Sequence, residues 1–240
     1  MSRGLFLSFE GIDGSGKSTQ ARLLARHLQE RGREVVLTRE PGGSEGAEEI
    51  RRLVLEGPPD RWSAETELLL FTAARRDHLE RLIRPALSRG AVVISDRFAD
   101  STRVYQGLTR GDLRSAVDLL HDKMIGMEPD RTFLIDMDPA RGLARALGRQ
   151  SGEERFESFG LEMQSRMRTG FADLAKDAPE RIVVIDGARD ADAVARSLPE
   201  HMHPHMTSIG GICRALDRVL EDIRTTAHAE ARRESAPQPV

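Results

Sequence analysis

Short apolar runs alternate with helical patterns along most of the chain. Between the runs, apolar residues recur at helical spacing, as Leu24 and Leu28 do after the first run. This alternation predicts an α/β fold: a doubly wound, five-stranded parallel sheet with helices on both faces. The predicted strands are the run that opens at Leu5, then Glu34–Thr38, Ala91–Asp96, Thr132–Asp136 and Arg181–Asp186.

Turn and capping residues set the expected helix limits. A helix is expected over Glu45–Glu56, and a long one from the N-cap Ser63 to Arg89, kinked or divided by Pro85. Further helical patterns cover 101–126 with a break near Gly107–Gly111, a stretch that starts at Pro139, and Phe156–Asp177.

The end of the chain leaves two arrangements open. Either Ala191–Leu198 is the last helix and an extension follows, or 199–211 is an inserted loop before a final helix over Ile212–Arg232. We therefore divide the chain into an α/β domain over 1–198, a C-terminal extension or inserted loop with a final helix over 199–232, and a tail over 233–240. The tail has the composition of a disordered segment.

The chemistry is concentrated after the first strand. Gly11-x-x-x-x-Gly16-Lys17-Ser18 is a complete P-loop pattern, preceded by a strand and followed by a helix. The glycines let successive backbone N–H groups turn toward one anion, and the helix N-terminus favours phosphate. Lys17 supplies a mobile cation, and the Ser18 hydroxyl suits Mg²⁺. Predicted ATP-binding residues are Gly11, Ile12, Asp13, Gly14, Ser15, Gly16, Lys17 and Ser18.

Composition narrows the class of protein. The chain has 240 residues, 31% of them charged, with a formal net charge of −3. It lacks the basic surface of a nucleic-acid binder, and no apolar run is long enough to span a bilayer. The single cysteine, Cys213, excludes an internal disulfide framework and fits a reducing compartment. We expect a cytoplasmic enzyme with no nucleic-acid or membrane partner.

Three further blocks resemble the thymidylate kinase family. They are Arg39-Glu40-Pro41-Gly42-Gly43, the stretch from Glu67 to Arg75, and Asp96-Arg97-Phe98 with Ser101-Thr102 and Tyr105-Gln106-Gly107. With the P-loop they occur in the family's order, and the resemblance covers roughly residues 4–190. It implies transfer of the γ-phosphoryl group of ATP to dTMP with Mg²⁺, by a protein that forms a homodimer through its helices.

The resemblance implies a role for residues around the acceptor's phosphate. Arg97 grips the 5′-phosphate, and Arg39 helps to place it. Asp96 works with Ser18 on Mg²⁺, and Asp13 accepts from the sugar's 3′-hydroxyl. Two anionic reactants need cations rather than a general base, and the arginines supply them.

The resemblance also implies how the base and sugar are chosen. Phe71 stacks on thymine and Arg75, four residues later on the same helix face, donates to its O4. Because arginine only donates, the amino group of cytosine would be repelled there. Arg76 is a rival for this role. Thr102 lies near thymine N3, Tyr105 crowds the 2′ position, and Ser101 belongs to the same acceptor site.

A mobile lid over about 149–156 is expected to supply the catalytic arginine. In the family that the chain resembles, the catalytic arginine lies either in the P-loop or in the lid. Here no variable position of the P-loop is basic, so the resemblance implies that the lid supplies the cation. Arg149 is our first choice, with Arg145 and Arg155 as rivals. Together with Lys17, Arg97 and Arg39 it completes the predicted catalytic set.

Three other interpretations stay open from the sequence. The chain could be a P-loop kinase for another nucleotide or nucleoside, or a non-catalytic nucleotide-dependent switch. His201-x-His203-x-His205 could hold a metal, but Pro204 and the lack of nearby carboxylates argue against it. The adenine-contacting residues, expected just after Asp186, cannot be assigned.

Overall fold

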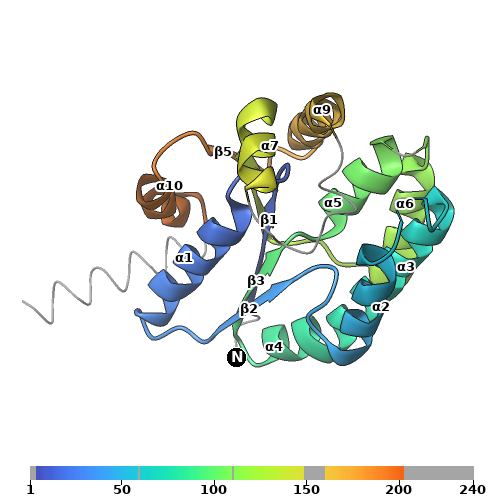
Figure 1. Ribbon diagram of the computed structural model, residues 1–240. Coiled ribbons are helices and arrows are strands. Elements are labelled where there is room, and N and C mark those ends of the chain that lie inside the picture. Colours follow the sequence, from blue (N-terminus) through green and yellow to red (C-terminus); the bar gives the residue numbers. More distant parts are fainter. Residues whose placement is uncertain (1–3, 59, 110, 149–159, 203–240) are drawn as a thin grey trace, which may run out of the picture. The chain divides into compact units, whose positions relative to one another are not determined.

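The structure is a computed structural model that describes residues 4–58, 60–109, 111–148 and 160–202 (Figure 1). The chain divides into two units, Met1–Leu198 and Pro199–Val240. Of the second unit only its first residues are described, and there Met202 N donates to Pro199 O at 3.4 Å. Three of the expectations above, the final helix over Ile212–Arg232, the tail and the histidines at 203 and 205, lie outside the described residues.

Five parallel strands form one sheet in the first unit, as predicted. Its order is β2-β3-β1-β4-β5, so that β1 is central. Each strand lies within a residue or so of its predicted limits. The strands are β1 Leu5–Glu10, β2 Val35–Arg39, β3 Val92–Asp96, β4 Arg131–Asp136 and β5 Ile182–Asp186.

The order of the strands fixes where ligands can bind. After β1 the chain moves to one side to build β2 and β3, and after β3 it crosses to the other side to build β4 and β5. The register pairs Phe9 of β1 with Asp96 of β3 and with Phe133 of β4. Ligands of open α/β sheets bind at such a reversal, outside the carboxyl ends of the strands. Here that place is the end of β1 and β3.

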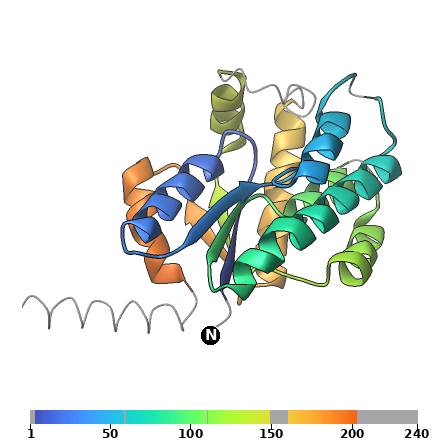
Figure 2. The same ribbon diagram turned by 90° about the horizontal axis from the view of Figure 1, so that it is seen from below.

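Helices cover both faces of the sheet, as the alternating pattern predicted (Figures 1 and 2). α1 (Lys17–Gln29) and α10 (Ala191–Ser197) contact each other on one face. The other helices include α3 (Ala64–His78), α4 (Arg84–Ser88), α5 (Ala99–Val104) and α9 (Leu161–Asp177), of which α4 contacts β3 and α9 contacts β4 and β5. The remaining ones are α2 (Glu45–Leu55), α6 (Arg114–Leu120) and α7 (Pro139–Leu147).

The core explains why the central strand is so apolar. Phe6, Phe9, Phe98 and Phe133 are fully buried, and the rings of Phe6 and Phe98 meet edge to face at 4.9 Å. Burial of each such ring contributes roughly 2–3 kcal/mol. The polar residue within β1, Ser8, is satisfied by Thr132 of β4 at 2.7 Å. Both faces of β1 are therefore buried, as expected of a central parallel strand.

The helix predicted from Ser63 to Arg89 is divided, but earlier than Pro85. Ser63 caps α3, and the π-helical segment η1 (Leu79–Ile83) separates α3 from α4. Pro85 lies in the first turn of α4. Because proline lacks an N–H and its ring crowds the carbonyl four residues back, the widened turn that precedes it relieves the clash.

Similar π-helical segments follow α5 and α6. η2 (Tyr105–Thr109) ends near the break predicted at Gly107–Gly111, and η3 (His121–Ile125) ends at Gly126, which has a φ of 58°. Among the described residues, no helix is long and apolar enough to cross a membrane.

Candidate active site

The predicted P-loop joins β1 to α1. Gly16, with a φ of 100°, precedes α1, and its carbonyl accepts from Thr19 N (3.0 Å) and Gln20 N (3.1 Å). The loop thus opens onto the first turn of a helix, where unpaired N–H groups and the helix dipole favour an anion.

The P-loop rests directly on α7. Gly14 has a φ of 72°, and a Cβ there would lie 2.0 Å from the carbonyl oxygen of Gly142. A Cβ on Gly142 would in turn lie 2.8 Å from the carbonyl oxygen of Asp13. Two glycines from distant parts of the chain therefore allow the backbone of the loop to pack against the helix that follows β4.

Lys17 lies inside this loop and is almost fully buried. Its Nζ donates to Ile12 O at 3.2 Å and lies 3.5 Å from Asp13 Oδ1. The charge is thus held over the backbone of the loop, next to a carboxylate that also belongs to the neighbouring cavity.

A cavity opens beside the P-loop, at the carboxyl ends of β1 and β3. It contains most of the predicted acceptor-binding residues: Asp13, Phe71, Arg75, Arg97, Ser101, Thr102 and Tyr105. Glu40, Pro41, Leu55, Phe98 and Gln106 complete its lining.

One end of the cavity is a cluster of charged groups around Arg97. Its guanidinium contacts Asp13, donates to Ser101 Oγ (3.1 Å) and to Tyr105 Oη (3.3 Å), and lies over the Tyr105 ring. The Tyr105 hydroxyl donates to Asp13 Oδ2 at 2.9 Å. Burial alone would raise the pKa of Asp13, but the charges of Arg97 and Lys17 outweigh it and hold the pKa below its ordinary value.

The other end is built on Arg75, whose side chain is buried. Its Nη2 donates to Thr102 Oγ1 (2.9 Å) and to Phe98 O (3.3 Å), while Nε donates to Glu40 Oε2 (2.7 Å). Arg76 instead contacts Glu80 and donates to Met124 O at 2.6 Å, away from the cavity. The structure therefore separates the two rivals: Arg75 lines the cavity and Arg76 does not.

A buried chain of polar groups supports Arg75 from behind. Glu40 Oε1 lies 3.1 Å from His78 Nδ1, and His78 Nε2 lies 2.8 Å from Thr38 Oγ1. Burial would raise the pKa of Glu40, yet the Arg75 charge and the contact with His78 lower it. Glu40 thus remains a carboxylate in the interior because it is paired on both oxygens.

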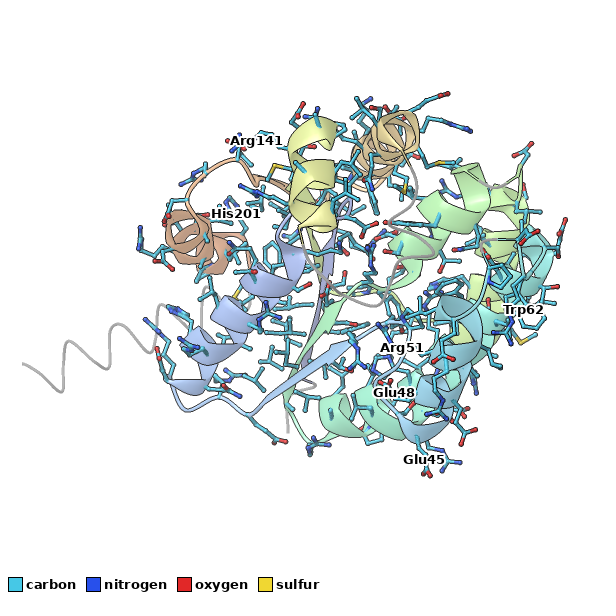
Figure 3. All side chains as sticks on the ribbon, in the orientation of Figure 1. Glu45, Glu48, Arg51, Trp62, Arg141 and His201 are labelled. Atoms are coloured by element: carbon cyan, nitrogen blue, oxygen red, sulfur yellow. The ribbon has the colours of Figure 1, made fainter. Side chains whose placement is uncertain are left out.

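Arg39, which was predicted to place the acceptor phosphate, is not among the residues that line the cavity. It ends β2, is half exposed and pairs with Glu48 of α2 at 3.0 Å. A second arginine near the cavity is Arg51 of α2, which donates to Pro41 O at 2.6 Å. Figure 3 shows Glu48 and Arg51 on the side of α2 that faces β2. Arg51 is a cation near the cavity wall that the motifs did not identify.

Asp96, predicted as a magnesium-associated residue, ends β3 beside the P-loop strand. Its Oδ1 is buried and has no hydrogen-bond partner in the described part of the chain. Within the same ranges, no group of three or more acidic, histidine or cysteine side chains could hold a metal by itself. A cation here would need ligands from a bound nucleotide.

Three buried acids of the site were not singled out from the sequence. Glu10, the last residue of β1, accepts from the backbone of α5, and Glu67 contacts Gln106 at 3.4 Å. Glu40 was quoted only as part of a motif. The signal for Glu10 was its place at the end of an otherwise apolar strand, where a charged side chain must find partners.

Of the three candidates for the catalytic arginine, only Arg145 is among the described residues. Arg149 and Arg155 lie outside the described residues, as does the predicted lid itself. Arg145, the third rival, is on α7, where its Nη1 lies 4.0 Å from Met137 Sδ. Figure 3 shows Arg141 on the same helix.

Fold and site together define a class of protein. A P-loop at the centre of a parallel sheet, with a cavity beside it that is lined by two arginines, is the arrangement of a nucleotide phosphotransferase.

Comparison with known proteins defines the family. The thymidylate kinase family model matches residues 9–198. Thymidylate kinase of Ruegeria pomeroyi is 70% identical over 203 residues, 85% of this chain and 96% of that protein. Thymidylate kinase of Caulobacter vibrioides is 50% identical over 83% of this chain and 96% of its own length. A crystal structure of thymidylate kinase from Ehrlichia chaffeensis matches with a TM-score of 0.63 and 41% identity, over 76% of this chain and 93% of that one. The chain belongs to the thymidylate kinase family.

Proposed function

We propose that this protein transfers the γ-phosphoryl group of ATP to dTMP, giving ADP and dTDP. The observation that carries the proposal is the shared position of Asp13. This residue belongs to the P-loop and also contacts Arg97 in the adjoining cavity. An anion in the loop and a second anion on Arg97 would therefore be neighbours.

The chemical step needs alignment and charge neutralisation. The attacking oxygen of a monophosphate is already anionic, so no side chain has to remove a proton. Lys17 neutralises the donor's outer phosphates, and Arg97 presents several N–H donors in one plane to the acceptor phosphate. Both side chains are largely shielded from solvent, at 8% and 15% exposure, and their effect on a charged transition state is larger there than in open water.

Base recognition depends on the Arg75 end of the cavity, and sugar recognition on Tyr105 and Asp13 at the Arg97 end. Arg75 and Thr102 are held together at 2.9 Å, and Arg75 can donate to O4 of thymine. Phe71 offers an aromatic surface for stacking. Tyr105, fixed by Asp13 and Arg97, occupies the place where a 2′-hydroxyl would have to fit, and Asp13 accepts from the 3′-hydroxyl.

Mg²⁺ fits the end of β3. The orphaned Oδ1 of Asp96 and the hydroxyl of Ser18 are oxygen ligands of the type it prefers, and a nucleotide-bound Mg²⁺ takes few ligands from protein. It would neutralise charge on the donor phosphates. The proposed lid arginine, Arg149, would add a further cation, and Arg39 would do so once it exchanges Glu48 for phosphate.

The function is tested by ADP release with a panel of acceptors. We expect kcat/KM for dTMP to exceed that for dCMP by about 100-fold or more, because the amino group of cytosine would face the N–H donors of Arg75 and offer them no acceptor. Comparison of dUMP with dTMP measures the contribution of the thymine methyl group to kcat/KM. Turnover of thymidine would indicate a nucleoside kinase. A preference for dCMP, or ATP binding without any monophosphate binding, would exclude the proposal.

We also propose that two copies associate through α2, α3, α6 and η3. These elements carry apolar side chains that are exposed in the single chain: Leu53, Leu69, Leu119 and Met124, at 40%, 58%, 59% and 48%. α3 contacts both α2 and η3, and Figure 1 shows α2, α3 and α6 close together. Apolar side chains gathered on neighbouring helices are typical of a subunit interface.

Replacing Leu69 with Asp is expected to convert the protein from a dimer to a monomer, since a charge would be buried in the interface. Sedimentation velocity measures the mass directly. Leu161→Glu is the matched control, because Leu161 is also half exposed but begins α9, where an acidic residue is favourable. A monomeric parent protein, or a dimeric Leu69→Asp variant, would contradict this interface.

The requirement for ATP and the single cysteine support a cytoplasmic location.

A further inference from the structure

Glu10 caps a helix to which it does not belong. Its Oε1 accepts from Phe98 N (2.7 Å) and Ser101 N (3.3 Å), and its Oε2 accepts from Ser101 Oγ (2.6 Å). All three donors belong to the start of α5, whose own N-cap residue, Phe98, makes no side-chain cap. The last residue of β1 thus satisfies the first turn of a helix that follows β3.

The capped turn contains an unusual backbone conformation. Arg97 has a φ of 72°, and in the described part of the chain it is the one residue other than glycine with a positive φ. This region is unfavourable for a residue with a Cβ unless the surroundings impose it. Here both flanking amides are held: Arg97 N donates to Phe9 O (2.9 Å) and Phe98 N donates to Glu10.

Glu10 also controls the Arg97 side chain. A guanidinium cannot accept, so Ser101 Oγ must accept from Arg97 Nη1 at 3.1 Å. The Ser101 hydroxyl in turn donates its hydrogen bond to Glu10 Oε2. The polarity of the chain Arg97–Ser101–Glu10 is therefore fixed, and it depends on a carboxyl oxygen at its end.

The Glu10 carboxyl group is buried and is affected by one charged neighbour of each sign, Asp100 and Arg97. Burial, and then the nearby Asp100, raise its pKa to about 7, while Ser101, Arg97 and the Phe98 amide act in the opposite direction. Asp100 is itself held by Arg103 (2.7 Å) and Arg181 (2.6 Å). Glutamine has nearly the same shape as glutamate, so we expect Glu10→Gln to be accommodated without unfolding.

We infer that Glu10 is a positioning residue that sets the affinity for the acceptor's phosphate through Ser101 and Arg97. It does not line the cavity, so it acts without touching the acceptor. The inference rests on the proposed function, because it takes Arg97 as the group that binds that phosphate.

The test compares dTMP with thymidine, which has the same base and sugar but no phosphate. Binding of each is measured by titration calorimetry. Glu10→Gln offers one acceptor oxygen in place of two, so that Phe98 N, Ser101 N and Ser101 Oγ can no longer all be satisfied as they are by the carboxyl group. We expect dTMP affinity to fall about tenfold and thymidine affinity to change less than twofold. Glu34→Gln, on an exposed glutamate that pairs with Arg89, is the matched control.

Arg97→Ala separates this inference from the function on which it rests. That variant should weaken dTMP about 100-fold with little effect on thymidine, and adding Glu10→Gln to it should cause no further loss of dTMP affinity. If Arg97→Ala weakens both ligands equally, the proposed phosphate site is wrong. If Arg97→Ala discriminates but Glu10→Gln weakens both equally or neither, the role of Glu10 alone is overturned.

Discussion

Replacing Lys17 with methionine is expected to lower kcat by about 10³-fold at saturating ATP and dTMP. Methionine keeps the apolar length of the side chain but removes the one mobile cation of the P-loop. The transferred group spreads its negative charge over oxygens that this cation would neutralise, and a single lost contact of this kind costs roughly 10²–10³ in rate. Because Lys17 is almost fully buried, water cannot easily replace it.

Single-turnover phosphoryl transfer, followed by quenched flow, measures the effect on the chemical step. Affinity for dTMP should change little, since the proposed site of the acceptor's phosphate is Arg97 rather than Lys17. Lys176→Met is the matched control: Lys176 is exposed on α9, where it pairs only with Asp173 among the described residues, and kcat should stay within twofold. A loss below tenfold for Lys17→Met would show that another cation carries the donor phosphates.

The sequence predicted those parts of the site that are local. The P-loop glycines, Lys17 and Ser18 lie within one short segment, and their function depends on the backbone turn that the segment forms. Phe71 and Arg75 are four residues apart on one helix, so their common face followed from helix geometry. The alternation of strands and helices could also be predicted from the sequence, because burial in each kind of element requires its own spacing of apolar residues.

What could not be predicted depends on contacts between distant segments. Glu10 meets Ser101 91 residues later, and Glu40 meets Arg75 35 residues later. No local rule fixes such partners. The partner of Arg39 is a further example, because its motif gave no sign that its side chain pairs with Glu48 of the next helix. The positive φ of Arg97 could not be predicted either, because the residue expected at such a position is glycine.

Replacing Arg75 with methionine is expected to affect stability and recognition together. The change leaves the Glu40 carboxylate buried with only His78 beside it, and breaking a buried pair from one side costs about 3–5 kcal/mol. The kcat/KM for dTMP should fall about 100-fold, because the proposed donor to O4 is lost, while discrimination against dCMP should largely disappear. Urea unfolding gives the stability, and ADP release with both monophosphates gives the recognition.

A second substitution separates the two effects. In Arg75→Met with Glu40→Gln, the buried charge is gone as well, so most of the lost stability should return while kcat/KM for dTMP stays low. Arg76→Met is the control for the neighbouring arginine, which is half exposed and pairs with Glu80, and it should change stability by less than about 1 kcal/mol. If the double variant recovers dTMP activity along with stability, Arg75 serves only to neutralise Glu40. The selectivity for thymine would then have to come from other residues that line the cavity, such as Thr102 and Gln106.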